Sequence, residues 1–275
     1  MSESEISVDL AAARESLRET TPLVNALTNE VTVNDVANVV LHWGGLPVMS
    51  DDEREVADMV AGANACLLNM GTVSETGERA MLTAGEAANE HGVPVVVDPV
   101  GVGATPTRDR VAERLVSDLD VALVSGNYGE VSALVGAESE VRGVESVGEY
   151  ADIAETAVAC ARETESVVVA SGEMDVVATA EAAYEVRSGH AMMGQVVGTG
   201  CMLGATLAAF AGAIEDDLSA AIAGTLAYGL AGEAAADGAF GEYHGPASYL
   251  TAFHDAVAGH DPEVDPSERI ERVVE

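Results

Sequence analysis

Short apolar runs alternate with longer Ala- and Glu-rich stretches through much of the chain, and this alternation restricts the folds open to it. Apolar runs bounded by Gly, Asn, Asp or Pro are typical of buried parallel strands. Strands that alternate with helices build layered α/β sheets with right-handed crossovers. We therefore expect an α/β fold of three layers, with a mostly parallel central sheet flanked by helices. The strands are expected at 65–69, 93–97, 121–124, 166–170, 176–178 and 182–186.

Helical stretches are expected between and around these strands. The last two strands are close together in the sequence and are expected to add a hairpin to the sheet. No linker or internal repeat is visible, so residues 1–275 are expected to form a single domain. Its acidic tails are placed at 1–8 and about 258–275, the second ending in a short helix. The helices are expected at 9–20, 34–43, 74–91, 107–117, 128–135 and 147–163, followed by two tightly packed helices between Thr199 and Gly238.

Charge and apolar content restrict the classes of function. The formal net charge is −35, and all twelve basic residues are Arg. Such a surface repels nucleic acid and anionic membranes, and it suits a salt-rich cytoplasm in which ions screen the repulsion. No apolar run reaches the roughly 18 residues of a membrane span, and residues 1–8 are unlike a signal peptide. Three scattered cysteines make neither a disulfide framework nor a zinc site. We expect a cytoplasmic protein that binds neither nucleic acid nor membrane.

Small and polar residues follow four of the expected strands. In an open α/β sheet, ligands bind beyond the carboxyl ends of the strands, so these segments are the best candidates for a site. Four such strand ends make a common site more plausible than four unrelated loops. The segments are 69–72 (NMGT), 98–101 (DPVG), 125–127 (SGN) and 171–173 (SGE).

Two acids at these strand ends are candidate metal ligands. Asp98 could hold Mg²⁺ directly or through water, because Mg²⁺ prefers one or two carboxylates together with phosphates and waters. The alternative for Asp98 is an Asp that only caps a turn. Glu130 lies near the third position of the next helix, where it could form a capping box with Asn127. Both interpretations of Glu130 can hold together.

A glycine-rich turn, Gly198-Thr199-Gly200-Cys201, leads directly into a long Ala- and Leu-rich stretch. Backbone N–H groups at such a helix start converge on an anion, and the helix dipole adds to their attraction. The alternative is a plain helix start with a buried, inert cysteine. The turn is not a Walker P-loop, because the GxxxxGK[ST] pattern is absent and the chain contains no lysine.

Seven short segments occur in a fixed order between about residues 14 and 257. They are 22–29 (PLVNALTN), 45–49 (GLPVM), 68–72 (LNMGT), 98–105 (DPVGVGAT), 126–130 (GNYGE), 171–175 (SGEMD) and 198–201 (GTGC). Any single segment is weak evidence, but seven in this order are specific. Together they make the chain resemble the hydroxyethylthiazole kinase family, a thiamine-salvage branch of the ribokinase-like superfamily. The resemblance implies the three-layer ribokinase-like fold.

The resemblance also implies an activity, which is ATP-dependent phosphorylation of the primary alcohol of 4-methyl-5-(2-hydroxyethyl)thiazole, assisted by Mg²⁺. It makes Asp98 and Glu130 the Mg²⁺-linked acids. It places Met49 and Gly198 in the thiazole site, with Asn25 nearby. It further implies a homotrimer with active sites between subunits, so that Asn25 and Met49 act across an interface.

The ATP site implied by the resemblance contains Ser125, Asn127, Ser171 and Gly172. The family commonly has Arg where Ser125 stands and Thr where Ser171 stands. Ser171 keeps the hydroxyl, whereas Ser125 cannot supply the positive charge. The absence of this Arg leaves three consequences open: weaker ATP binding, a compensating residue elsewhere, or reliance on a high cation concentration.

Cys201 holds the place at which most ribokinase-like kinases carry an Asp as general base. Phosphoryl transfer needs mainly positioning and charge stabilisation, so a weak base can suffice. The N–H groups from Gly198 through Thr199 and Gly200 to Cys201 would neutralise charge on the transferred phosphoryl group. The same field is expected to lower the pKa of Cys201 and favour a thiolate that accepts the alcohol proton.

Three other functions remain open. A hydroxymethylpyrimidine (phosphate) kinase also carries Cys after its glycine turn, but residues 22–29 lack the Gly/Ser-rich opening of that family. A ribokinase-like hydro-lyase acting on hydrated nicotinamide cofactor usually carries Asp at the Cys201 position. A non-catalytic ATP-binding homologue is conceivable because of Ser125.

Overall fold

A nine-stranded sheet forms the centre of the computed structural model, which describes residues 8–136, 141–142, 145–146, 152–262 and 264–274. The strand order is β11-β10-β9-β8-β5-β4-β3-β1-β2. Strands β2, β1, β3, β4, β5 and β8 run parallel, and β9, β10 and β11 continue the sheet in antiparallel pairing. The bounds are β1 Leu23–Leu27, β2 Leu46–Val48, β3 Ala65–Asn69, β4 Val95–Asp98, β5 Leu123–Asn127, β8 Val167–Ser171, β9 Asp175–Ala178, β10 Ala183–Val186 and β11 Ile270–Val274, with a separate ladder of β6 Val141–Arg142 and β7 Glu145–Ser146.

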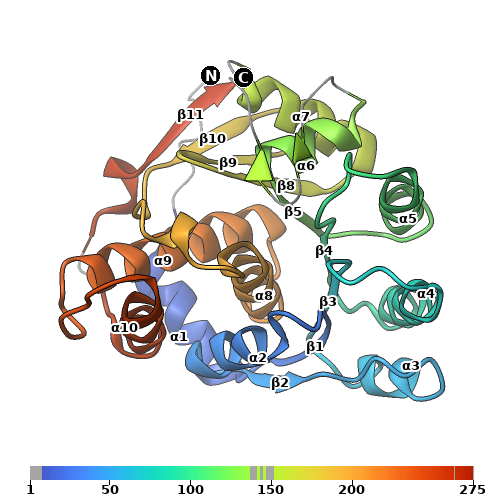
Figure 1. Ribbon diagram of the computed structural model, residues 1–275, viewed down its shortest axis with the longest axis horizontal. Helices are drawn as coiled ribbons and strands as arrows, with labels where there is room; N and C mark the ends of the chain where they lie inside the picture. Colours follow the sequence, from blue (N-terminus) through green and yellow to red (C-terminus); the bar gives the residue numbers. More distant parts are fainter. Residues whose placement is uncertain (1–7, 137–140, 143–144, 147–151, 263, 275) are drawn as a thin grey trace.

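Helices cover both faces of this sheet and complete three layers (Figure 1). One apolar core lies between the sheet and helices α1, α2, α8, α9 and α10, and a second core lies between the sheet and helices α3 to α7. The bounds are α1 Leu10–Thr20, α2 Val33–His42, α3 Val56–Val60, α4 Glu75–His91, α5 Pro106–Ser117, α6 Tyr128–Leu134, α7 Ile153–Thr164, α8 Thr199–Ala211, α9 Asp217–Ala236 and α10 Pro246–Gly259, with 3₁₀ turns η1 Met193–Gln195 and η2 Pro266–Glu268.

Local sequence explains where several helices begin and end. Ser74 caps α4 by accepting a hydrogen bond from the Gly77 N–H at 3.0 Å, and Gly92 ends it in the left-handed conformation at φ 66°. Thr105 caps α5, with Pro106 at the first helical turn. Helices α8 and α9 are apolar on nearly every side because both are buried over most of their length.

The expected α/β fold is confirmed, with a mostly parallel sheet between two layers of helices. The expected strands and helices occur within a few residues of their observed bounds, and β9 and β10 form the expected hairpin. Strands β1 and β2, the β6–β7 ladder, and helices α3 and α10 were not anticipated from the sequence. The first part of the helix expected at 147–163 lies outside the described residues, as do residues 1–7 of the first tail. The single-domain organisation stays a prediction.

The expectation of a helix at the end of the second acidic tail is wrong. Residues Ile270–Val274 form β11, which pairs antiparallel with β10 at the edge of the sheet. The segment alternates apolar and charged residues only weakly, and its pairing partner lies more than eighty residues earlier in the chain. Tertiary pairing with an open sheet edge therefore decides its conformation.

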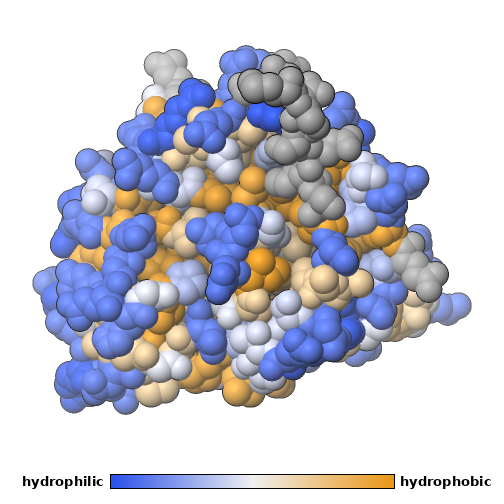
Figure 2. All heavy atoms as spheres, turned by 180° about the vertical axis from the view of Figure 1, so that it is seen from behind, coloured by the Kyte–Doolittle hydropathy of each residue, from blue (hydrophilic) through white to orange (hydrophobic). Residues whose placement is uncertain are grey.

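Hydrophilic residues cover much of the face shown in Figure 2, with hydrophobic residues visible between them. Some acids bind more than one of the few arginines. Glu78 on α4 binds both Arg110 and Arg114 on α5, at 3.2 and 2.7 Å. Among the described residues, none of the helices has the length and apolar character needed to cross a bilayer.

Two histidines meet between α2 and α10, and their contact predicts a pH effect. The Nδ1 atoms of His42 and His254 are 3.2 Å apart, so at least one ring must be neutral to accept the hydrogen bond. Burial lowers the pKa of both histidines, and His42 lowers that of His254 further, against the opposing effects of Asp35 and Asp255. The unfolded chain therefore binds more protons than the folded one as the pH falls below about 6.5.

We expect the free energy of unfolding to fall through this pair as the pH is lowered from 7.5 to 5.5. His254→Gln should flatten the pH dependence, and His244→Gln, at an exposed position, should leave it as in the wild type. Denaturant unfolding at constant high KCl measures both slopes. Equal slopes for wild type and His254→Gln would exclude the pair as the cause.

Candidate active site

Polar side chains gather where the parallel strands β1, β3, β4, β5 and β8 end. The strand register places Asn69 opposite Asp98 and Asn127 opposite Ser171. Asn29 lies two residues beyond β1, which neighbours β3. The expectation that these strand ends form one region is therefore supported by strand pairing, and this is the edge at which open α/β sheets bind ligands.

Asp98 is the buried acid at the centre of this edge. Its Oδ2 accepts a hydrogen bond from the Asn69 Nδ2. Burial raises the pKa of Asp98 well above its ordinary value, the Glu130 charge raises it further, and the Asn69 hydrogen bond opposes both. The Gly204 position, one turn beyond Cys201 in α8, lies against this acid: a Cβ there would be 3.3 Å from the Asp98 Oδ2. Helix α8 therefore lies directly against Asp98.

Glu130 is held by backbone groups on both sides. Its Oε2 accepts from the Asn127 N–H at 2.8 Å, and its N–H donates to the Asn127 Oδ1 at 3.0 Å, which is the expected capping box. Its Oε1 accepts from the Gly101 N–H at 2.7 Å, so it also ties down the loop that follows Asp98. Burial raises the pKa of Glu130, while these two N–H groups and Arg108 oppose the increase.

The burial and mutual repulsion of Asp98 and Glu130 fit a bound magnesium ion. Both are buried, and the charge of Glu130 raises the pKa of Asp98, so a cation between or beside them would relieve a real electrostatic cost. Within the described part of the chain, no group of three or more His, Cys, Asp or Glu residues could hold a metal ion. Waters and phosphate oxygens would have to complete the coordination, which is the usual arrangement for Mg²⁺.

Arg108 on α5 was missed by the sequence analysis, although it stands within three residues of the 98–105 segment. Its guanidinium donates to the carbonyl oxygens of Met70 at 3.1 Å, Gly71 at 2.9 Å and Val100. It thus joins the loop after β3 to the loop after β4. It is a positive charge beside Glu130.

Cys201 lies in the first turn of α8, and its sulfur faces the loop after β1. The Asn29 Nδ2 is 3.4 Å from the Cys201 Sγ. Burial raises the pKa of Cys201 to about 11, and the charge of Asp98 adds to the increase, against hydrogen bonds from Asn69, Thr32 and Asn29. The expected lowering of this pKa is therefore wrong, because desolvation and a neighbouring carboxylate raise it.

The remaining residues of the glycine turn have distinct roles. Gly198 precedes α8 at φ 97°, a left-handed conformation that favours glycine. The Thr199 hydroxyl donates to the carbonyl oxygens of Met193 and Val196 at 3.1 and 3.3 Å, and the Tyr228 hydroxyl donates to the Thr199 carbonyl at 2.7 Å. Gly200 is exposed. The first-turn N–H groups point out of the helix start, as an anion cradle requires.

Gly198→Ala is expected to destabilise the fold and to inactivate the protein. A Cβ at this position would lie 2.6 Å from the Thr32 Cγ2, and a positive φ is itself unfavourable for alanine. The expected loss is about 1–3 kcal/mol in the free energy of unfolding, measured by denaturant titration in high KCl. Gly200→Ala is the control: nothing lies within 4 Å of its Cβ position, so stability should be retained or slightly raised. Equal stabilities of the two variants would contradict this account.

The residues expected at the ATP site lie together at the ends of β5 and β8. Ser125 is buried within β5, and the Ser171 hydroxyl donates to the Gly126 carbonyl at 3.4 Å. Asn127 is committed to the α6 cap. A Cβ on Gly172 would meet the Tyr128 ring at 2.4 Å, so glycine there allows the ring to cover the turn after β8. Nucleotide binding by these residues stays a prediction.

Two of the residues expected at the thiazole site, Asn25 and Met49, are buried or half-buried. The Asn25 side chain is buried, donates to the Ser50 carbonyl at 3.2 Å and accepts from the Ser50 N–H at 3.3 Å. It therefore joins β1 to the segment after β2. Met49, beside Ser50, is half-buried and packs against the core of the α8 face. Their contact with substrate stays a prediction.

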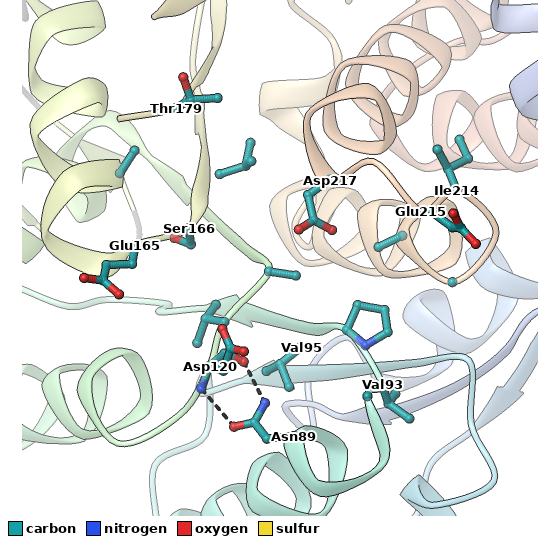
Figure 3. A pocket seen from close by; sticks show the side chains of 18 of the residues that line it. Asn89, Val93, Val95, Asp120, Glu165, Ser166, Thr179, Ile214, Glu215 and Asp217 are labelled. Carbon is teal, nitrogen blue, oxygen red and sulfur yellow. Dashed lines mark hydrogen bonds between the residues drawn. The ribbon is translucent and has the colours of Figure 1, made fainter. Parts of the chain in front are cut away.

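A separate cavity of about 970 Å³ lies at the opposite edge of the sheet, around the amino ends of β4, β5 and β8 (Figure 3). Asn89 spans part of it, donating to the Asp120 carbonyl at 2.7 Å and accepting from the Asp120 N–H at 2.8 Å. Asp98, Glu130 and Cys201 do not line this cavity. The carboxyl edge therefore remains the candidate site.

Several known proteins are similar to this chain in sequence or in structure. The model of the hydroxyethylthiazole kinase family matches residues 15–262. A protein named hydroxyethylthiazole kinase from Haloquadratum walsbyi is 64% identical over 98% of this chain and 95% of its own length. The solved hydroxyethylthiazole kinase from Pyrococcus horikoshii has a TM-score of 0.83 at 33% identity, covering 96% of this chain and 98% of that one. A ribokinase-like superfamily protein from Enterococcus faecalis, 11% identical with a TM-score of 0.65 over 94% of this chain and 98% of its own, is similar in fold.

Proposed function

The chain belongs to the hydroxyethylthiazole kinase family, and we infer that its strand-end site transfers the γ-phosphoryl group of ATP to the primary alcohol of 4-methyl-5-(2-hydroxyethyl)thiazole. One observation carries the placement of the reaction: the start of α8 lies against the buried Asp98, with Cys201 one turn from the contact. The glycine turn and Cys201, which would act as a base, thus lie on one side of the site. The acidic groups Asp98 and Glu130, which suit a cation, lie on the other.

Each side of the site has its own task in the transfer. The N–H groups of Gly198, Thr199, Gly200 and Cys201 would stabilise negative charge on the transferred phosphoryl group. Asp98 would hold Mg²⁺, directly or through water, with Glu130 alongside, and the ion would neutralise charge on the phosphate oxygens. The alcohol oxygen attacks the γ-phosphorus while the bond from that phosphorus to the β,γ-bridging oxygen breaks, which leaves ADP.

Cys201 would take the proton of the attacking alcohol. A thiolate whose pKa is about 11 is a stronger base than an ordinary thiolate, but only a small fraction of it exists at neutral pH. A cation held by Asp98 removes the second cause of the raised pKa, namely the carboxylate charge. The base and the metal site are therefore coupled through Asp98.

Ser125 leaves the ATP site without the Arg that the family commonly has. Arg108 does not replace that charge directly, because its guanidinium is used by the carbonyl groups of Met70, Gly71 and Val100. We propose that ATP binding relies on the Mg²⁺ charge and on Ser171, Asn127 and Gly172 at the ends of β5 and β8.

A homotrimer with shared active sites is part of this proposal. Exposed apolar side chains flank the site: Val31 is 73% exposed in the loop after β1, and Val197 is 74% exposed just before α8. Large apolar side chains at such exposure are the kind that a partner subunit covers. Light scattering after size exclusion in high KCl measures the mass, and a monomer would refute the trimer. A cytoplasmic location stays a prediction.

A coupled assay that follows ADP release tests the function. We expect turnover of the thiazole alcohol, dependence on Mg²⁺, and higher activity in molar KCl than in dilute buffer, because salt screens the net charge of −35. The pyrimidine alcohol of hydroxymethylpyrimidine is the control substrate. Activity on the pyrimidine alone would refute the thiazole assignment, and ATP binding without turnover of either alcohol would indicate a non-catalytic protein.

A further inference from the structure

We propose that Asn29 is a positioning residue for Cys201, and that its side-chain amide holds the sulfur by a donated hydrogen bond. Asn29 is buried in the loop between β1 and α2. Its Nδ2 lies 3.4 Å from the Cys201 Sγ and 3.0 Å from the Asn69 Oδ1. The assignment of Cys201 as the base rests on the proposed function, whereas the hold on the sulfur does not.

Backbone donors fix which end of the Asn29 amide faces the sulfur. The Asn29 Oδ1 accepts from the N–H groups of Val31 and Thr32 at 3.0 and 3.1 Å. A backbone N–H can only donate, so the oxygen must face the loop. The nitrogen must then face Cys201 and Asn69.

The same reasoning fixes the second amide. The Asn69 Oδ1 accepts from the Gly71 N–H at 3.0 Å and from Asn29, so the Asn69 Nδ2 faces Asp98. A chain of hydrogen bonds therefore runs from Cys201 through Asn29 and Asn69 to Asp98. The two ends of this chain, the Cys201 sulfur and the Asp98 carboxylate, both accept hydrogen bonds. The side-chain N–H groups of Asn29 and Asn69 donate every hydrogen bond between them.

This arrangement has a chemical consequence at the sulfur. A donor aimed at sulfur stabilises the thiolate more than the thiol, because hydrogen bonds to charged acceptors are stronger. Asn29 thereby opposes the burial that disfavours the thiolate. It also fixes the sulfur's place against the N–H groups of α8, because Asn29 is itself anchored by the backbone of Val31 and Thr32.

Thr32 lies in the same loop, close to both Cys201 and Gly198. Its buried Oγ1 lies near the Cys201 sulfur and, like Asn29, opposes the rise in the pKa of that thiol. Its methyl group is close to Gly198, the residue before α8. The loop that Asn29 anchors therefore faces the place where the reacting groups meet.

Asn29→Asp tests the proposal because it keeps the oxygen and replaces the donor. The carboxylate still accepts from Val31 and Thr32 but repels the thiolate. Asn29→Ser is the second variant: its short hydroxyl can form the local turn without reaching the sulfur, and it adds no charge. Asn64→Asp is the matched control, because Asn64 accepts from the Leu23 N–H at 2.9 Å at the opposite end of β1.

Two measurements are made on each variant in high KCl. The first is kcat and KM for the thiazole alcohol. The second is the rate of alkylation by iodoacetamide at one fixed pH, which reports on Cys201 because Cys66 and Cys160 are fully buried. We expect Asn29→Asp and Asn29→Ser to lower kcat by about 10- to 100-fold with little change in KM, and to slow alkylation about 10-fold. Asn64→Asp should match the wild type in both.

The outcomes separate this proposal from the assignment of function. Alkylation at the wild-type rate in Asn29→Ser would overturn the hold on the sulfur, whatever happens to kcat. A wild-type kcat in both variants would overturn the role of Asn29 in positioning Cys201 for the reaction. If the wild-type protein turned over neither alcohol, the proposed function would fail, and the alkylation rates would still decide whether Asn29 holds Cys201.

Discussion

Cys201→Ala is expected to lower kcat by about 10²- to 10⁴-fold, the range that a positioned general base contributes. Alanine suits the first turn of α8, and the half-buried position tolerates the smaller side chain, so the fold should be retained. The N–H groups of the turn remain in place, so a residual rate above background is expected. The loss should appear in kcat, with KM for the alcohol nearly unchanged.

Cys201→Asp is the companion variant, and it should keep substantial activity because a carboxylate restores a base at the same place. The control is Cys160→Ala, which removes a buried sulfur in α7 and should affect stability but not kcat. Normal turnover by Cys201→Ala would refute the base role and leave only the N–H cradle. Activity in Cys201→Asp as low as in Cys201→Ala would also count against a base at this position.

Asp98→Asn is expected to separate activity from stability. Removing the carboxylate should lower kcat by about 10²-fold or more and weaken the dependence of the rate on Mg²⁺, because the cation loses its charged ligand. The free energy of unfolding should be unchanged or higher. Burial raises the pKa of Asp98, which means that its charged form costs free energy in the folded protein above its unfolded pKa. Asparagine keeps the shape and can still accept from Asn69.

Mg²⁺ titrations of the rate, combined with denaturant unfolding, measure both effects. Asp109→Asn is the matched control, because the exposed Asp109 accepts from the Gly103 N–H at 2.7 Å in the neighbouring loop and lies outside the strand-end set. An unchanged Mg²⁺ titration in Asp98→Asn would refute the metal assignment. A marked loss of stability would show instead that the Asp98 charge supports the fold.

The alternation of apolar runs and helical stretches was sufficient to predict the α/β class and most strand positions. Buried parallel strands are apolar along their whole length, and β3 and β4 follow this rule. Strand β1 was harder to recognise because it contains the buried Asn25, and β2 is only three residues long with Pro47 at its centre. Strand β11 depends on an edge created by a distant hairpin.

The sequence by itself determined the positions of the strand-end acids and of the glycine turn before α8, because caps, turns and strand ends are set by neighbouring residues. Asp98 and Glu130 lie where their local patterns placed them. Only the tertiary structure decided the chemistry around Cys201. Its neighbours come from the ends of β1, β3 and β4, and their hydrogen bonds exist only when the sheet is assembled. Burial raises the pKa of the Cys201 thiol, reversing the local expectation, because desolvation depends on everything packed around a group.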